Sequence, residues 1–150
     1  MIKINYPEKK PAIKNEAGRD FIFCMIRKRW VVITPEEWVR QNFLLYLTEV
    51  LKYPVSLIAV EKQLALGDLK KRFDIVVYDK QARPFMIVEC KEMNVRLTEK
   101  VLQQVLRYNI SLQTGILVVT NGSYCYTFEK AGDNFVEKDE IITCPEVKNL

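Results

Sequence analysis

RFDIVVYDKQARPFMIVECKEM, residues 72–93, is the stretch that decides the fold of this chain. Two apolar runs of strand length flank the turn-forming residues DKQARP, and this pattern predicts a β-hairpin. Both runs include charged residues at positions that a strand would bury. Asp74 begins the first run, and Glu89 and Lys91 end the second. A buried charge is costly unless a partner compensates it. These three residues are therefore candidates for a functional site.

The expected register brings the two acids together. A hairpin closed near residues 81 and 82 places Asp74 opposite Glu89, and Tyr78 opposite Phe85. Glu89 and Lys91 are two residues apart, so they are expected on the same face as Asp74. Opposed carboxylates repel each other, and a bound Mg²⁺ or Mn²⁺ would remove that penalty. Replacing Asp74 with Asn should then leave the metal-free fold at least as stable. The alternative is a structural salt bridge between Lys91 and one of the acids.

The rest of the chain supplies further elements around the hairpin. A Thr-Pro-Glu-Glu sequence predicts the start of a helix over about 35–51, and a cap at Asn94 or Thr98 starts a second helix that runs to about Leu112. Strand patterns cover 55–64, 116–120 and 123–129, with a C-terminal hairpin at 131–134, while 21–33 predicts two short strands joined by a basic turn at 27–29.

These elements predict an α/β (α+β) fold in which helices flank a mixed central sheet. Residues 1–18 are expected to be loosely ordered, and 19–150 to form a single domain. The order from residue 35 is helix, three strands, helix, strand and a final strand pair, with an additional hairpin at the N-terminal end.

The second predicted helix has a core face and a polar edge. Gln104 and Tyr108 lie one turn apart at that edge, and Lys100 and Arg107 lie beyond them. Such a stripe of amide, phenol and cations suits a phosphodiester backbone, although it would also serve as an ordinary polar rim. A basic cluster that includes Lys71 and Arg72 leads directly into the hairpin and is open to the same two interpretations.

Composition limits the chemistry that this chain can perform. The chain has 49% hydrophobic and 28% charged residues, so it can bury a core. It has no histidine, and its four cysteines show no CxxC pair, which argues against a structural zinc site and against histidine-dependent catalysis. Cys90 alternates with Glu89 along its strand, which predicts a packed core thiol rather than a nucleophile. No apolar run approaches the ~20 residues of a membrane span, and a cytoplasmic location is expected.

Three linked motifs carry a family resemblance. Asp74, the ECK of residues 89–91 and the QVLRY of residues 104–108 resemble the PD-(D/E)XK nuclease superfamily. More specifically, FIFCMIRKRWVVITPEEWVRQNFLLYL, YPVSLIAVEKQL, KRFDIVVYD and VVTNG resemble the N-terminal nuclease domain of type I restriction enzyme R subunits, in the short stand-alone form found in bacteria. The resemblance covers about residues 20–129. It implies a restriction-endonuclease-like αβββαβ core and a Mg²⁺-dependent DNA endonuclease that takes part in restriction-modification.

The resemblance also implies roles for individual residues. Asp74 and Glu89, with the backbone carbonyl of Cys90, would bind Mg²⁺ or Mn²⁺, and Lys91 would position or activate the attacking water. Gln104 would support the catalytic geometry. The nucleic-acid-binding set would comprise Gln104, Tyr108, Lys100, Arg107, Lys71 and Arg72. In some relatives an acid from the first helix joins the site, and Glu49 is the interior candidate here.

Two departures from the family pattern bear on function. Phe73 stands where the namesake proline would be. The chain also lacks the GxxxxGK phosphate loop of a translocase, so this chain cannot translocate DNA and other restriction or DNA-processing subunits are expected partners beside DNA. No membrane partner is expected, and the sequence sets no oligomeric state. Two rival hypotheses are a non-catalytic DNA-binding or assembly module with the nuclease fold, and a purely structural domain.

Overall fold

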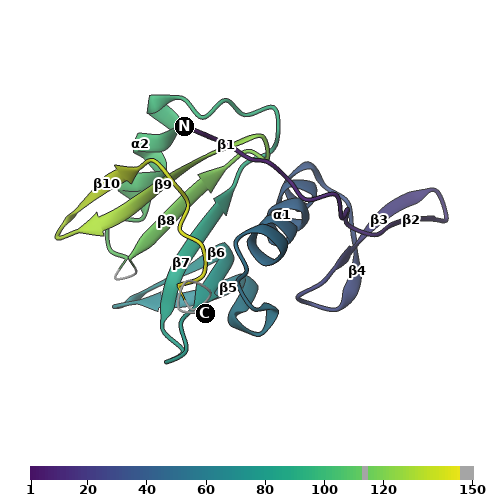
Figure 1. Cartoon of the computed structure of the whole chain (residues 1–150), viewed down its shortest axis with the longest axis horizontal. Helices are drawn as coiled ribbons and strands as arrows, with labels where there is room; N and C mark the ends of the chain where they lie inside the picture. Colours follow the sequence, from purple (N-terminus) through teal and green to yellow (C-terminus); the bar gives the residue numbers. More distant parts are fainter. Residues whose placement is uncertain (113–114, 146–150) are drawn as a thin grey trace.

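A seven-stranded mixed sheet forms the centre of the fold (Figure 1). The computed structural model describes residues 1–112 and 115–145. The strands run in the order β1-β9-β8-β7-β6-β5, with β10 paired to β9; β7 and β8 are parallel and the other neighbours are antiparallel. Their bounds are β1 (Ile2–Lys3), β5 (Ile58–Leu66), β6 (Leu69–Tyr78), β7 (Pro84–Cys90), β8 (Ile116–Thr120), β9 (Tyr124–Ala131) and β10 (Asn134–Lys138). The predicted fold class is confirmed.

The hairpin of β6 and β7 has the predicted register over most of its length. Ile75 lies opposite Val88, and the next two pairs follow the same spacing. Tyr78 lies opposite Pro84 rather than Phe85, so this detail of the prediction was wrong. The register shifts at the turn end, where proline has no amide to donate to the ladder. At the other end the paired residues stop at Ile75 and Val88, one position before Asp74 and Glu89.

The first helix, α1 (Pro35–Leu45), begins as its sequence predicts. The Thr34 hydroxyl accepts a hydrogen bond of 3.0 Å from the Glu37 amide, and proline occupies the first turn. A π-helical turn, Tyr46–Val50, extends the helix to the expected length. None of the helices in the described part of the chain is long and apolar enough to cross a membrane.

The second helix, α2 (Glu99–Tyr108), starts at the Thr98 cap but ends four residues before the expected Leu112. Asn109 has non-helical backbone angles (φ −105°, ψ 15°), and its side-chain amide donates a 2.8 Å hydrogen bond to the Val105 carbonyl. The backbone amide and the side-chain amide of Asn109 thus both donate to the Val105 carbonyl, and the helix ends where the backbone leaves helical angles.

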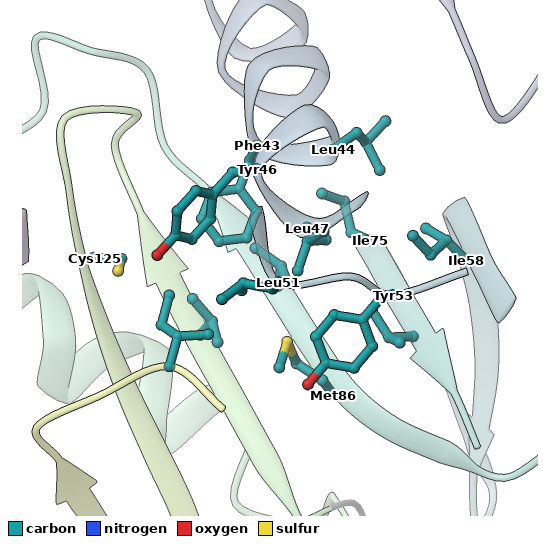
Figure 2. Packing of buried hydrophobic residues seen from close by; sticks show 14 of the residues in the cluster. Phe43, Leu44, Tyr46, Leu47, Leu51, Tyr53, Ile58, Ile75, Met86 and Cys125 are labelled. Atoms are coloured by element: carbon teal, nitrogen blue, oxygen red, sulfur yellow. The ribbon is translucent and has the colours of Figure 1, made fainter. Parts of the chain in front are cut away.

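Two hydrophobic clusters pack the helices against opposite faces of the sheet. Ile75 and Val77 of β6 belong to the cluster with α1, whereas Val76 between them belongs to the cluster with α2. Figure 2 shows Phe43 and Leu47 packed among residues of the strands on the α1 side. Successive side chains of a strand point to opposite faces of the sheet, so neighbouring positions pack against different helices. This alternation decides which residues can meet at the site.

A separate three-stranded sheet stands beside α1, away from the central sheet (Figure 1). It comprises β2 (Ile13–Glu16), β3 (Arg19–Cys24) and β4 (Arg29–Val32). The last two are the predicted pair with its basic turn. Residues 1–18, for which the sequence predicted loose order, contribute β1 and β2. The four residues of β2 are mostly polar and therefore carried little strand signal.

Candidate active site

Asp74 and Glu89 meet where the β6–β7 hairpin opens. One Asp74 oxygen accepts a 2.7 Å hydrogen bond from the Cys90 amide, and its carboxylate also interacts with the Glu89 side chain. The alternation along β6 breaks here, because Phe73 belongs to the same cluster as Val76. The two acids therefore lie together as predicted, at the position where the alternation of β6 between the two clusters breaks.

The backbone on the neighbouring strand is strained at the same level. The ladder between β5 and β6 passes from Val60–Ile75 to Lys62–Phe73, and Glu61 between these pairs has a φ of 48°. Left-handed backbone is uncommon for a residue other than glycine and costs on the order of 1 kcal/mol or more. The Glu61 side chain is paired with Arg27, Arg40 and Arg72, and the distortion lies beside Asp74.

Glu89 is the most perturbed acid at this site. Burial, followed by the charge of Asp74, raises the pKa of Glu89 to about 7, and the charge of Lys91 offsets part of that rise. The protonated form of this carboxyl therefore persists to a higher pH than in an ordinary glutamate. A carboxyl with such a pKa, next to a second acid, is typical of catalytic and metal-binding sites.

Arg40 of α1 compensates the charge of Asp74. Its guanidinium lies 3.0 Å from Asp74 Oδ1 and 2.9 Å from Glu37 Oε1, and the residue is only 5% exposed. The salt bridge that the sequence suggested for Lys91 is thus formed by Arg40. Two oxygens of Asp74 are consequently engaged, one by Arg40 and the other by the Cys90 amide.

A network of ion pairs extends from Arg40 to the three-stranded sheet. Arg27, in the turn between β3 and β4, lies 2.7 Å from Glu37 and 3.3 Å from Glu61. Glu61 also lies 3.2 Å from Arg72. Burial would raise the pKa of Glu37, but hydrogen bonds from Arg27 and Gln41 and the neighbouring positive charges hold that pKa below its usual value.

Glu89 and Lys91 line a hollow of about 370 Å³ beside α2. Gln104 and Tyr108 line the same hollow, as the sequence predicted, and Tyr108 is 58% exposed. Asn109, which the sequence did not single out, also lines it; this residue is fully buried, and its Oδ1 has no hydrogen-bond partner among the described residues. The hollow thus combines an acid, a cation and hydrogen-bonding groups in one place.

The four predicted phosphate-binding cations occupy different surroundings. Lys100 and Arg107 are exposed on α2. Lys71 donates to the Tyr108 carbonyl, and its ammonium lies 4.0 Å from the centre of the Tyr108 ring. Arg72 pairs with Glu61 instead of reaching the hollow. Three of the four cations therefore lie on or against α2.

Glu49, the acid of the first helix considered for the site, lies away from the two strand acids. Glu49 is on the surface and pairs with Lys9 at 3.3 Å. The charge of Glu36, in the first turn of α1, is the smallest of the contributions that raise the pKa of Glu89. Cys90 is 4% exposed, and burial raises the pKa of its thiol well above the usual value, in agreement with a packed core residue.

The donors available for a metal ion are two carboxylates rather than a dense acidic cluster. Within residues 1–112 and 115–145 no group of three or more His, Cys, Asp or Glu side chains is placed to hold a metal. Asp74 and Glu89 provide hard oxygen donors, and a backbone carbonyl could add another. The repulsion that raises the pKa of Glu89 is the feature that a divalent cation would relieve.

Comparison with known proteins assigns the family. Residues 35–141, more than two thirds of the chain, match the type I restriction enzyme R protein N terminus (HSDR_N). This range contains both acids, Lys91 and the whole of α2. A comparison with curated proteins gives no match. The chain therefore belongs to the family of type I restriction enzyme R protein N termini, which supports a nuclease-like role in restriction.

Proposed function

We propose that the chain is a metal-dependent DNA endonuclease domain of the PD-(D/E)XK type, which hydrolyses phosphodiester bonds without a translocase motor of its own. The observation that carries the proposal is the meeting of Asp74 and Glu89 beside a hollow that also contains Lys91, Gln104 and Tyr108. Family membership supports the same conclusion.

The residues of the site would bind the metal ion, position the attacking water and hold the DNA backbone. Asp74 and Glu89, with the carbonyl of Cys90, would hold Mg²⁺ or Mn²⁺, which when bound would acidify water and offset charge on the phosphate. Lys91 would orient the attacking water or contact a phosphate oxygen. Gln104 and Tyr108 would hold the DNA backbone against the hollow.

The exposed cations extend this surface. Lys100 and Arg107 on α2 would contact phosphates away from the reaction centre, and Lys71 would hold the end of α2 while presenting positive charge. Arg72 would act through Glu61 and through long-range attraction. Target choice would come from other restriction or DNA-processing subunits or from the structure of the DNA.

Plasmid cleavage tests the proposal. The purified chain should convert supercoiled plasmid to nicked or linear form with Mg²⁺ or Mn²⁺ and not with EDTA. Glu89→Gln should abolish this conversion, whereas Glu99→Gln, an exposed acid at the start of α2, should not change it. Equal cleavage by the Glu89→Gln protein would mean that the nuclease is a contaminant or that the site lies elsewhere.

One observation favours a second candidate, a DNA-binding or assembly module without catalysis. Both oxygens of Asp74 already have partners, and a buried arginine beside the acids opposes cation binding by charge repulsion. In that case the wild-type chain would bind DNA with Mg²⁺ present and leave linear, supercoiled and branched substrates intact.

A further inference from the structure

The positive charge of this chain is concentrated at its N-terminal end. Residues 1–34 contain eight lysines and arginines against three acids, whereas the remaining residues contain fifteen against sixteen. The formal net charge of +4 therefore originates before Pro35. The match to the R-protein family also begins at residue 35, so the β2-β3-β4 sheet lies outside the matched region.

One face of this sheet carries aromatic rings and cations together. Arg19, Phe21 and Phe23 alternate along β3 with Ile22 and Cys24, which are fully buried on the opposite face. The register sets Phe21 between a lysine of β2 and a valine of β4, and Phe23 opposite a tryptophan of β4. The face that looks away from the buried side is made up of Lys14, Glu16, Arg19, Phe21, Phe23, Trp30 and Val32, and is called the aromatic face below. Glu16 is its one acid; it lies opposite Arg19 and forms an exposed ion pair of 2.9 Å with Lys14, which a phosphate would have to displace.

Its rings and cations are in direct contact. The ring centres of Phe23 and Trp30 are 5.4 Å apart in an edge-to-face arrangement. The Lys14 ammonium lies 4.7 Å from the centre of the Trp30 ring, and the Arg19 guanidinium lies 5.9 Å from that of Phe21. Trp30 is 38% exposed, an unusual amount for a large aromatic residue held in a sheet. The cations thus stand beside ring surface that solvent can reach.

The aromatic face is fixed relative to the catalytic acids. Arg27, in the turn that joins β3 to β4, donates hydrogen bonds to Glu37 and Glu61, and Glu37 is bound by Arg40, which binds Asp74. Lys28, next to Arg27, is exposed. A chain of ion pairs therefore connects the aromatic face to the edge where the acids meet.

We propose that the aromatic face binds single-stranded DNA by stacking bases on Phe21 and Trp30 while Lys14 and Arg19 contact phosphates. Stacking surfaces bordered by cations are the means by which proteins hold unpaired strands, whereas the bases of a duplex present no free faces. The positive charge of the N-terminal region matches a polyanion. This inference deepens the proposed function, because it names the form of DNA presented to the same site.

Binding of a labelled oligothymidylate of about 16 nucleotides, compared with a duplex of the same length, tests the inference. The full chain is used in EDTA, so that cleavage cannot interfere. Trp30→Ala should weaken single-strand binding by about 5- to 100-fold and duplex binding by less than about twofold. Tyr124→Ala, an aromatic residue of similar exposure on β9, should change neither affinity.

Two further measurements keep the inference testable if Trp30→Ala folds poorly. Lys14→Gln should flatten the dependence of log Kd on log salt by about 0.7, the value expected for one phosphate contact on a single strand. In a Trp38→Phe background Trp30 is the only tryptophan, and its fluorescence should be quenched by the oligonucleotide. Absence of quenching, or equal losses for single strand and duplex in Trp30→Ala, would overturn the inference.

The outcomes separate this inference from the proposed function. Single-strand binding that depends on Trp30, without plasmid cleavage, would support the aromatic face and reject the nuclease. Cleavage that is unaffected by loss of Trp30, with unchanged single-strand affinity, would support the nuclease and reject the aromatic face.

Discussion

Neutralising the two acids one at a time should change stability in opposite directions. Asp74→Asn removes a charge that Arg40 compensates, whereas Glu89→Gln removes a charge that is buried and repelled. We therefore expect Asp74→Asn to destabilise the metal-free chain at pH 8 and Glu89→Gln to stabilise it. The sequence alone predicted that Asp74→Asn would be neutral or slightly stabilising, and the ion pair with Arg40 is the reason for the revision.

The magnitudes follow from the contacts. Removing one partner of a buried ion pair costs about 3–5 kcal/mol, and in Asp74→Asn an NH2 group replaces one of the two oxygens that separately accept from Arg40 and from the Cys90 amide. A rise in the pKa of Glu89 from 4.5 to about 7 corresponds to at most about 3 kcal/mol, and burial is its largest cause. Relief of the repulsion with Asp74 is therefore worth about 1 kcal/mol. The net loss for Asp74→Asn is about 2–4 kcal/mol, and the gain for Glu89→Gln is at most about 3 kcal/mol.

Urea unfolding followed by far-ultraviolet circular dichroism, in EDTA at pH 8 and at pH 5, measures both changes. The gain for Glu89→Gln should shrink at pH 5, because wild-type Glu89 is then protonated in the folded state. Stabilisation by Asp74→Asn, or shifts of the same sign for both variants, would refute the role assigned to Arg40.

Three other predictions use the same contacts. Because the pKa of Glu89 is raised in the folded state, protonated Glu89 stabilises the metal-free fold at low pH, and this contribution should be lost as the pH rises from about 4.5 through 7. The loss should be absent from Glu89→Gln, and a series of unfolding curves across that pH range checks both expectations. Arg40→Met should destabilise the fold by about 3 kcal/mol, because it removes the cation shared by the buried Glu37 and the half-buried Asp74 while Glu37 keeps Arg27, and a urea midpoint would record the loss. Lys71→Ala, which loses an exposed contact with the end of α2, should cost about 0.5–1 kcal/mol by the same measurement, and a loss of several kcal/mol would show that Lys71 is more than a surface cap.

Local sequence signals predicted the hairpin and the meeting of its acids well. The alternation around Ile75 and the turn residues after Tyr78 determine which strands pair, and Glu89 and Lys91 then follow from the period of two. Gln104 and Tyr108 were placed correctly because helix periodicity sets their common edge. These are features in which neighbouring positions carry the information.

The parts that sequence did not predict depend on contacts between distant segments. Arg40 lies in the buried stripe of α1, one turn after Glu37 and one turn before Leu44, and a charge in that stripe was the signal available. Its partners come from β5, from β6 and from the helix itself, so its role required the tertiary structure. The left-handed conformation of Glu61 likewise has no signature in the local sequence, where the residue lies in a strand pattern without glycine or asparagine, and its ion-pair partners come from distant segments.

The most direct test of the central claim compares DNA binding and single-turnover cleavage in the Lys91→Ala protein. If the acids and Lys91 form a nuclease site, Lys91→Ala should leave DNA affinity nearly unchanged and reduce the cleavage rate by about 100-fold or more, because Lys91 would act mainly in the transition state. Lys100→Ala, the matched control on exposed α2, should instead weaken binding and lower the salt slope by about one, with little effect on the rate at saturating protein. Cleavage by Lys91→Ala at the wild-type rate, or DNA binding by the wild type with Mg²⁺ and no cleavage of any substrate, would contradict the claim.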